Sequence, residues 1–211
     1  MTQEPAIRLP VRMVLFDYGN VLEFVDHRRS AGRLCEGTGC DPDVLLRRFL
    51  EPRGPLEQLE TGRIDGDTFR RIAGEAIGKT FTEADFLERF NDMFVMRHDT
   101  IALMKALHGR YRLGLLSNTS EPHFRATISK HPCFGLFDQV TLSFQVGAQK
   151  PDPAIYRDAL EKAAGISAEQ ILYLDDIPAY VEAARNEGMQ ALVYDRAGEV
   201  AEQLRAVLGR R

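Results

Sequence analysis

The sequence predicts an α/β fold in which a doubly wound parallel sheet carries an α-helical insert. Three observations lead to this prediction: short apolar runs without alternation, helical patterns between them, and one long interval that holds helical patterns alone. Runs without alternation are typical of strands buried on both faces of a parallel sheet. Strands that alternate with helices are typical of the doubly wound architecture.

Four apolar runs are the predicted strands, and each ends in a polar residue. They are VRMVLFD at 11–17, YRLGLLSN at 111–118, ILYLDD at 171–176 and MQALVYD at 189–195. Helical patterns are found at 99–108, 153–164, 177–188 and 197–208. In the third of these, Pro178 lies in the first turn and Gly188 closes the end, as expected for a helix between two strands.

The interval from residue 22 to residue 98 has a different character. It contains the amphipathic stretches DPDVLLRRFL, DTFRRIAGEAIG and TEADFLERFNDMF, each opened by Asp or Thr in an N-cap position. No strand run is found among them, so we expect an insert of roughly four helices. The predicted organisation is a core domain of residues 1–21 and 99–211 and a helical domain of residues 22–98.

Composition and charge exclude several classes of partner. The chain has 27 Lys and Arg against 31 Asp and Glu, a net charge of −4, which gives no electrostatic footprint for nucleic acid or an anionic membrane. Cys35, Cys40 and Cys133 have no metal-ligand spacing, and reduced thiols fit them best. The N-terminus lacks an apolar signal core and no run has membrane-spanning length, so a cytoplasmic protein is expected. The sequence makes no prediction of oligomeric state.

Polar residues at the ends of the predicted strands are the candidate functional residues. Ligands of open parallel sheets bind beyond the carboxyl ends of the strands. Three of the runs end there in candidate side chains: Asp17, Ser117 with Asn118, and Asp175 with Asp176. Lys150 joins them, because it precedes a helix start marked by proline.

Together these residue types suit phosphoryl transfer. A carboxylate such as Asp17 can attack phosphorus, provided a cation neutralises the dense negative charge. Hard oxygen ligands suit Mg²⁺, a serine hydroxyl can donate to a phosphate oxygen, and Lys150 can balance charge. Each residue also has an ordinary structural explanation: Ser117 or Asp176 as a helix N-cap, and Lys150 as a solvated loop charge. Their joint occurrence in order at strand ends favours the functional interpretation.

The same residues carry a resemblance to a known family. FDYGNVL, LLSNTS, KPDPAIY and YLDDIPAYVEAA resemble the four motifs of the haloacid dehalogenase-like (HAD) hydrolases, whose core is Rossmann-like. The insert after the first motif is similar to the C1-type cap of that superfamily. The resemblance implies Asp17 as nucleophile, Ser117 as phosphate-binding hydroxyl and Lys150 as charge-balancing lysine. It further implies that Mg²⁺ is held by Asp17, the Gly19 carbonyl and Asp176 with Asp175 beside it, and that substrate contacts Tyr18, Gly19, Ser117, Asn118 and Lys150.

Two residues depart from the family pattern. Phosphatases of the family usually carry a second Asp two residues after the nucleophile as acid and base, where this chain has Gly19. Loss of such proton transfer typically costs ~10²–10⁴-fold in rate. Tyr180 stands where Asn or Asp is frequent, which weakens support of the metal site. Asp26 and His27, at the start of the insert, are weak candidates for the missing acid.

The form Asp-x-Gly-Asn is similar to the first motif of a group resembling α-glucose-1-phosphate phosphatase. The expected function is a Mg²⁺-dependent phosphatase that acts on a small phosphomonoester, such as a sugar phosphate, through an aspartyl phosphate. A 2-haloacid dehalogenase fits less well, since it needs no metal and leaves Asp175 and Asp176 unexplained. A phosphomutase needs the acid missing at Gly19. A non-catalytic or weakly active phosphate-binding or regulatory protein is the alternative from another class.

Overall fold

The core of the molecule is a five-stranded sheet. The computed structural model describes residues 7, 10–194 and 204. All adjacent strands pair in parallel, in the order β5-β4-β1-β6-β7. The strands are β1 (Met13–Phe16), β4 (Arg112–Ser117), β5 (Gln139–Leu142), β6 (Ile171–Asp175) and β7 (Gln190–Val193). The predicted doubly wound α/β fold is confirmed.

The sheet has one strand more than predicted, and β5 is the addition. Its sequence QVTL contains two polar residues, so it does not read as an apolar run. Gln139 and Thr141 are nevertheless buried, because each is hydrogen-bonded to the neighbouring helix. The Gln139 amide donates to the Ala159 carbonyl over 3.0 Å, and the Thr141 hydroxyl donates to Asp158 Oδ2 over 2.8 Å.

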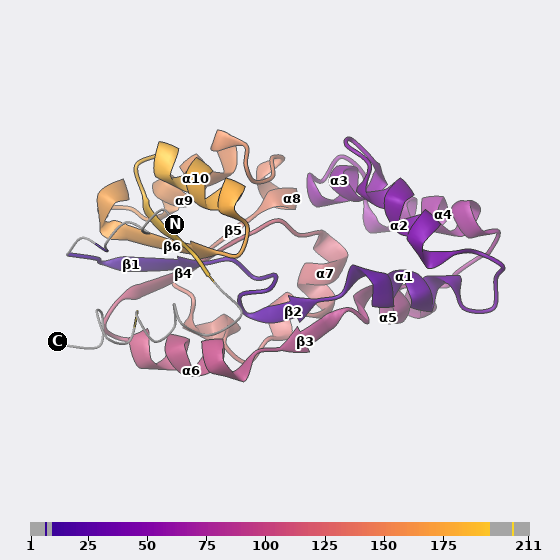
Figure 1. Cartoon of the computed structure of the whole chain (residues 1–211), viewed down its shortest axis with the longest axis horizontal. Helices are drawn as coiled ribbons and strands as arrows, with labels where there is room; N and C mark the ends of the chain where they lie inside the picture. The colour runs from indigo at the N-terminus through magenta and orange to yellow at the C-terminus, as the bar shows by residue number, and fades with distance from the viewer. Residues whose placement is uncertain (1–6, 8–9, 195–203, 205–211) are drawn as a thin grey trace, which may run out of the picture.

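Helices cover both faces of the sheet (Figure 1). Alternate residues of β1 face opposite sides, as the pleat of a strand requires. Val14 and Phe16 belong to the apolar cluster that contains α6 (His98–Leu107), while Met13 and Leu15 belong to the cluster under α9 and α10. The other core helices and 3-10 turns are α7 (Glu121–Ala126), α8 (Ser143–Val146), α9 (Pro153–Lys162), α10 (Pro178–Asn186), η1 (Ile128–Lys130), η2 (Phe134–Leu136) and η3 (Ala168–Gln170). The predicted helix 197–208 lies outside the described residues except for Leu204.

The helices of the insert pack on an apolar cluster of their own. They are α1 (His27–Cys35), α2 (Pro42–Leu50), α3 (Pro55–Glu60), α4 (Gly66–Ile77) and α5 (Glu83–Asn91). Phe69, Phe86 and Phe90 form the centre of this cluster, with ring centroids 5.1–6.1 Å apart. Asp41 and Thr82 cap α2 and α5 as predicted, but α4 is capped by Asp65 rather than Asp67. The short helix α3 explains why five helices are present instead of roughly four.

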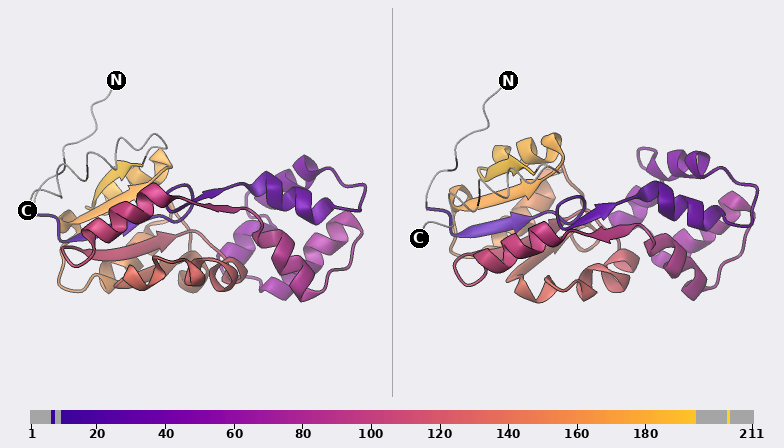
Figure 2. Two further views of the ribbon diagram at one scale, coloured as in Figure 1. Left: turned by 90° about the horizontal axis from the view of Figure 1, so that it is seen from below. Right: turned by 60° about the horizontal axis from the view of Figure 1, so that its bottom comes forward.

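A two-stranded antiparallel ribbon links the sheet to the helical insert. It consists of β2 (Glu23–Val25) and β3 (Phe94–Met96), which run side by side in Figure 2. The expectation that residues 22–98 contain no strand was therefore wrong. Strands of three residues are too short for an alternating pattern to stand out, and pairing of two distant segments stabilises them.

The helical insert also touches the core away from the ribbon. Gly62, which follows α3, has φ 65°, and a Cβ there would lie 2.5 Å from the Phe144 carbonyl oxygen on α8. Phe90 of α5 stacks on His123 of α7 with ring centroids 4.2 Å apart. These contacts hold the insert over the carboxyl ends of the strands (Figure 1). None of the helices in the described part of the chain has the length and apolar character that crossing a bilayer requires.

Candidate active site

Asp17 follows β1 directly and lies at the floor of a pocket between the sheet and the insert. Its side chain is buried, with 6% of the residue exposed. Asp17 Oδ1 lies 2.8 Å from the Nζ atom of Lys150. The backbone N–H of Asp17 donates to the Leu174 carbonyl on β6, which continues the sheet to this residue. The residue predicted as nucleophile is thus bonded through its backbone to β6, at the end of a central strand.

Lys150 is the centre of the polar network, and it is almost completely buried at 1% exposure. Its Nζ lies 2.7 Å from Asp175 Oδ2 and donates to the Tyr173 hydroxyl over 3.0 Å. The Asn118 side chain fixes the backbone of Lys150: Oδ1 accepts from the lysine N–H over 2.7 Å, and Nδ2 donates to its carbonyl over 3.1 Å. A solvated loop charge is therefore excluded as an explanation of Lys150.

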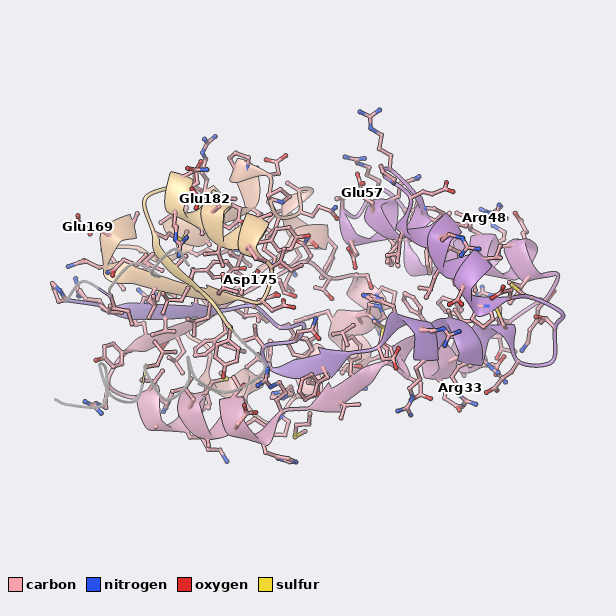
Figure 3. All side chains as sticks on the ribbon, viewed as in Figure 1. Arg33, Arg48, Glu57, Glu169, Asp175 and Glu182 are labelled. Atoms are coloured by element: carbon pink, nitrogen blue, oxygen red, sulfur yellow. The ribbon has the colours of Figure 1, made fainter. Side chains whose placement is uncertain are left out.

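Asp175 and Asp176 are adjacent but have different environments. Asp175 Oδ2 accepts from Lys150 and from the Tyr173 hydroxyl, while Oδ1 accepts from the Ile177 N–H over 2.8 Å. Asp175 lies at the edge of the sheet that faces the insert (Figure 3). Its oxygens are thus engaged by protein groups. Asp176 lines the pocket and has no ion-pair partner among the described residues.

The helix-capping explanations of Ser117 and Asp176 are also excluded by the geometry. The N-cap of α7 is Ser120, whose Oγ accepts from the His123 N–H. At the start of α10, the Ile177 N–H is bonded by Asp175, not by Asp176. Ser117 instead is buried at the pocket wall, next to Asn118.

Burial and charge shift the proton affinities of this network. Burial raises the pKa of Asp17 to about 7, and the Asp175 charge adds to the effect, while Lys150 opposes it. Burial lowers the pKa of Lys150, but the carboxylates of Asp17 and Asp175 outweigh burial and raise it overall. Burial and the neighbouring Asp175 raise the pKa of Asp176. The site therefore has more negative charge than one lysine neutralises, which favours a bound cation.

The carboxylates fit a hard divalent cation. One oxygen from each of Asp17, Asp175 and Asp176 lies within 4.8 Å of the others. Mg²⁺ is usually held by one or two carboxylates and keeps several waters. Because Asp175 is engaged by Lys150 and Tyr173, Asp17 and Asp176 retain the acceptor capacity for such an ion. The donor set thus matches Mg²⁺, and Gly19 lines the same pocket with its backbone.

The pocket has a volume of about 200 Å³ and gathers residues from distant parts of the chain. The predicted residues that line it are Asp17, Tyr18, Gly19, Ser117, Asn118, Lys150 and Asp176. Asp175 lies beneath this surface, fully buried. This volume suits a phosphate group with a short organic portion, and the helical insert forms part of the pocket wall.

Several lining or supporting residues were missed by the sequence reasoning. Tyr173 orients Lys150 and Asp175 from two residues before Asp175, a spacing that puts both on one face of β6 and was a usable signal. Tyr180, noted in the sequence only as a departure from the family pattern, lines the pocket, and its ring centroid lies 5.0 Å from Lys150 Nζ. Glu60 enters the pocket from α3, and no local pattern predicts that placement. Of the two weak candidates for the acid missing at Gly19, His27 lines the pocket, whereas Asp26 caps α1 by accepting from the Arg29 N–H.

Fold and site together place the chain among α/β proteins with an aspartate at the end of a central strand. Residues 45–188 match the family model of the haloacid dehalogenase-like hydrolases. The chain belongs to this family, and the predicted superfamily assignment is confirmed.

Relatives named as phosphatases match over nearly the whole chain. A phosphatase of Mycobacterium tuberculosis is 36% identical over 90% of this chain and 90% of its own length. The D-ribitol-5-phosphate phosphatase of Bacteroides thetaiotaomicron is 24% identical over 94% of this chain and 98% of its own. A HAD family enzyme of the same organism, solved with magnesium and inorganic phosphate, superposes with a TM-score of 0.79. That match has 23% identity, covers 88% of this chain and 95% of the other, and shows a shared fold.

Proposed function

We propose that the protein is a Mg²⁺-dependent phosphatase that hydrolyses a small phosphomonoester, such as a sugar or polyol phosphate. The observation that carries the proposal is the buried Lys150 between Asp17 and Asp175, with Asp176 beside them at the end of the sheet. Full-length phosphatase relatives support the reaction class, and one of them is a D-ribitol-5-phosphate phosphatase.

In the first chemical step, an oxygen of Asp17 attacks phosphorus. The bond from phosphorus to the leaving oxygen breaks, its electron pair stays on that oxygen, and an aspartyl phosphate forms. Mg²⁺, when bound, supplies positive charge to the phosphoryl oxygens and to the nucleophile. Lys150 supplies further positive charge from below, and the Ser117 hydroxyl donates to a phosphoryl oxygen.

In the second step, water attacks the phosphorus atom of the aspartyl phosphate. The bond to Asp17 breaks and the carboxylate is regenerated. Tyr173 and Asn118 hold Lys150 in place throughout, one through the ammonium group and the other through the backbone. A proton must reach the leaving oxygen in the first step and must leave water in the second, and Gly19 has no side chain for either transfer.

The helical insert of residues 22–98 is proposed as the cap that selects the substrate. Val25, His27, Glu60 and Met93 of this interval line the pocket. Because the phosphate-binding residues come from the sheet, these insert residues are left to contact the organic portion of the substrate. The shape and polarity of that wall would then determine which phosphomonoester is accepted.

A 2-haloacid dehalogenase is the second candidate from the sequence, and Asp176 argues against it. Asp175 is partnered by Lys150 and Tyr173, so it needs no cation. Asp176, in contrast, is an acid in a pocket where burial and Asp175 raise its pKa, and a metal explains its position.

The decisive experiment is phosphate release from a panel of sugar, polyol and aryl phosphates, with Mg²⁺ and with EDTA. We expect turnover with Mg²⁺, none with EDTA, and none in Asp17→Asn. Asp67→Asn is the matched control, because Asp67 is exposed and pairs with Arg70 on the surface. Halide release from 2-haloacids, without phosphate release from the panel, would support the dehalogenase. Phosphate binding without turnover would support a non-catalytic role.

A further inference from the structure

The pocket contains an acidic side chain that the proposed phosphatase mechanism does not use. Among the described residues that line it, the carboxyl groups are those of Asp17, Asp176 and Glu60. Asp17 is assigned to nucleophilic attack and Asp176 to the cation. Glu60 is the remaining acid, and it comes from the helical insert rather than from the sheet.

The chain around Glu60 is fixed against the core. Glu60 ends α3, and the next residue, Thr61, closes the helix through its N–H and its hydroxyl, which both donate to the Glu57 carbonyl. Gly62 then adopts φ 65° and passes so close to Phe144 that a Cβ would lie 2.5 Å from its carbonyl oxygen. Glu60 is therefore held at the rim of the pocket by a turn that lies against α8.

The Glu60 carboxyl is available for chemistry. Within the described part of the chain, no hydrogen bond or ion pair engages it, in contrast to Glu57 on the same helix, which accepts from the Arg53 N–H. Its charge interacts with Lys150 and with Tyr180, both of which line the pocket. A carboxyl that points into a substrate pocket without a protein partner is suited to a proton transfer with substrate or water.

The environment gives Glu60 a proton affinity matched to this task. Burial raises the pKa of Glu60 to about 7, Glu57 adds to the effect, and Lys150 opposes it. A group with pKa near the working pH is present in both protonation states, as an acid that becomes a base must be. The other titratable groups that line the pocket are Asp17, Tyr18, His27, Lys150, Asp176 and Tyr180.

We propose that Glu60 is the general acid and base of the reaction, supplied by the cap in place of a side chain at Gly19. This inference rests on the proposed phosphatase function. In the first step, the Glu60 carboxyl gives its proton to the leaving oxygen, so that the alcohol departs neutral and Glu60 becomes a carboxylate. In the second step, water attacks phosphorus while its proton passes to Glu60. The products are the alcohol and inorganic phosphate, and both Asp17 and Glu60 return to their starting states.

His27 is the competing residue, since it also lines the pocket. Burial lowers the pKa of His27, which favours the neutral imidazole, and the N–H of a neutral imidazole is a far weaker acid than a carboxyl group. His27→Gln is therefore expected to keep the leaving-group dependence of the wild type.

The test compares two substrates that differ in leaving group. An alkoxide, as from glycerol phosphate, needs a proton to depart, whereas para-nitrophenolate does not at neutral pH. For Glu60→Gln we expect kcat/KM to fall ~10²–10⁴-fold with glycerol phosphate, the range for general acid catalysis, and to stay near the wild-type value with para-nitrophenyl phosphate. Because the second step also loses its base, the variant should release a burst of nitrophenolate equal to the enzyme concentration and then turn over slowly.

Two controls separate this inference from others. Glu75→Gln makes the same chemical change on the exposed face of the insert and should leave both rates unchanged. Carbon-13 NMR of labelled glutamate should show a carboxyl that titrates near neutral pH in wild type and is missing in Glu60→Gln. Unchanged signals of the other glutamates would confirm that the variant is folded.

The outcomes are distinct for the inference and for the function on which it rests. If wild type releases phosphate with Mg²⁺ but Glu60→Gln behaves like wild type on both substrates, the inference is overturned and the phosphatase stands. An equal loss on both substrates without a burst assigns Glu60 to binding and also overturns it. Absence of Mg²⁺-dependent phosphate release from every substrate in wild type overturns both.

Discussion

At the residue scale, Gly19 is the position where a conventional acid can be restored. Its backbone does not have positive φ, and a Cβ would meet Val25 Cγ2 at 3.4 Å, an ordinary contact. We expect Gly19→Asp, in the Glu60→Gln background, to recover at least about tenfold in kcat/KM on an alkyl phosphate, because a carboxyl again reaches the leaving oxygen. Gly19→Asn in the same background adds similar bulk without a transferable proton and should recover nothing. Equal rates in the two double variants would contradict the prediction.

Replacing Lys150 should lower both the stability and the activity of the protein. It is buried between Asp17 and Asp175, so Lys150→Met leaves two buried carboxylates without their cation. We expect the free energy of unfolding in EDTA to fall by about 3–5 kcal/mol, the usual result of removing one partner of a buried pair. Lys162→Met removes a partly exposed pair with Asp158 and should cost about 1 kcal/mol or less. A similar loss in both variants, measured by urea unfolding, would be evidence against this account.

The sequence predicted the pocket residues that follow strands, but not those that reach it by other routes. Asp17, Ser117 and Asp176 are found because the carboxyl ends of parallel strands share one edge of the sheet. Lys150 is found because a proline marks the helix start after it. Glu60 lies on no strand, and its place depends on how Gly62 packs against Phe144, a contact across 82 positions of the chain that no local pattern records.

At the scale of secondary structure, β4 depends on the absence of a side chain at Gly114. A Cβ there would lie 2.4 Å from Leu15 Cδ2 and 2.7 Å from Met13 Cε, both in the closed core under α9. We expect Gly114→Ala to lower the free energy of unfolding by about 1–3 kcal/mol through overpacking. Gly32→Ala is the control: it lies in α1 with nothing within 4 Å of the added carbon, and should raise stability by up to about 1 kcal/mol. Thermal unfolding of both variants checks the opposite signs.

The elements that the sequence missed are those whose stability comes from partners distant in the chain. The long apolar strands and amphipathic helices are encoded locally, and they were predicted within a few residues. In β5, polar Gln139 and Thr141 are buried only because α9 offers them an acceptor each. The ribbon of β2 and β3 joins residues about 70 positions apart, such as Val25 and Phe94, so neither strand is recognisable alone.

At the scale of the whole molecule, the insert and the sheet form one pocket because they are joined at several places. The ribbon of β2 and β3 is one connection, and the approach of Gly62 to Phe144 is another. The third is at His123 of α7, whose ring stacks on Phe90 and whose Nδ1 lies 2.8 Å from Asn91 Oδ1 on α5. Since residues from both the insert and the sheet line the pocket, weakening one connection should lower the activity as well as the stability.

His123 makes the closed arrangement sensitive to acid, and this can be measured. Burial lowers the pKa of His123 from 6.5 to about 3, with a smaller contribution from His27. Below pH 6.5 the unfolded chain therefore binds a proton that the folded protein does not, so stability is lost as the pH falls from there towards 3. Between pH 7.5 and 5.5, the free energy of unfolding of wild type should fall by roughly 1.4 kcal/mol more than that of His123→Gln, which cannot take up that proton.

The readout is the difference between two pH values, because His123→Gln also loses its stacking on Phe90 and is expected to be less stable at both. His108→Gln is the matched control, since His108 is exposed on the core and should leave the acid sensitivity of wild type intact. Urea unfolding of the three proteins at both pH values gives the comparison. If His123→Gln loses as much stability on acidification as wild type does, His123 takes up its proton in the folded state, and the acid sensitivity of the closed arrangement has another source.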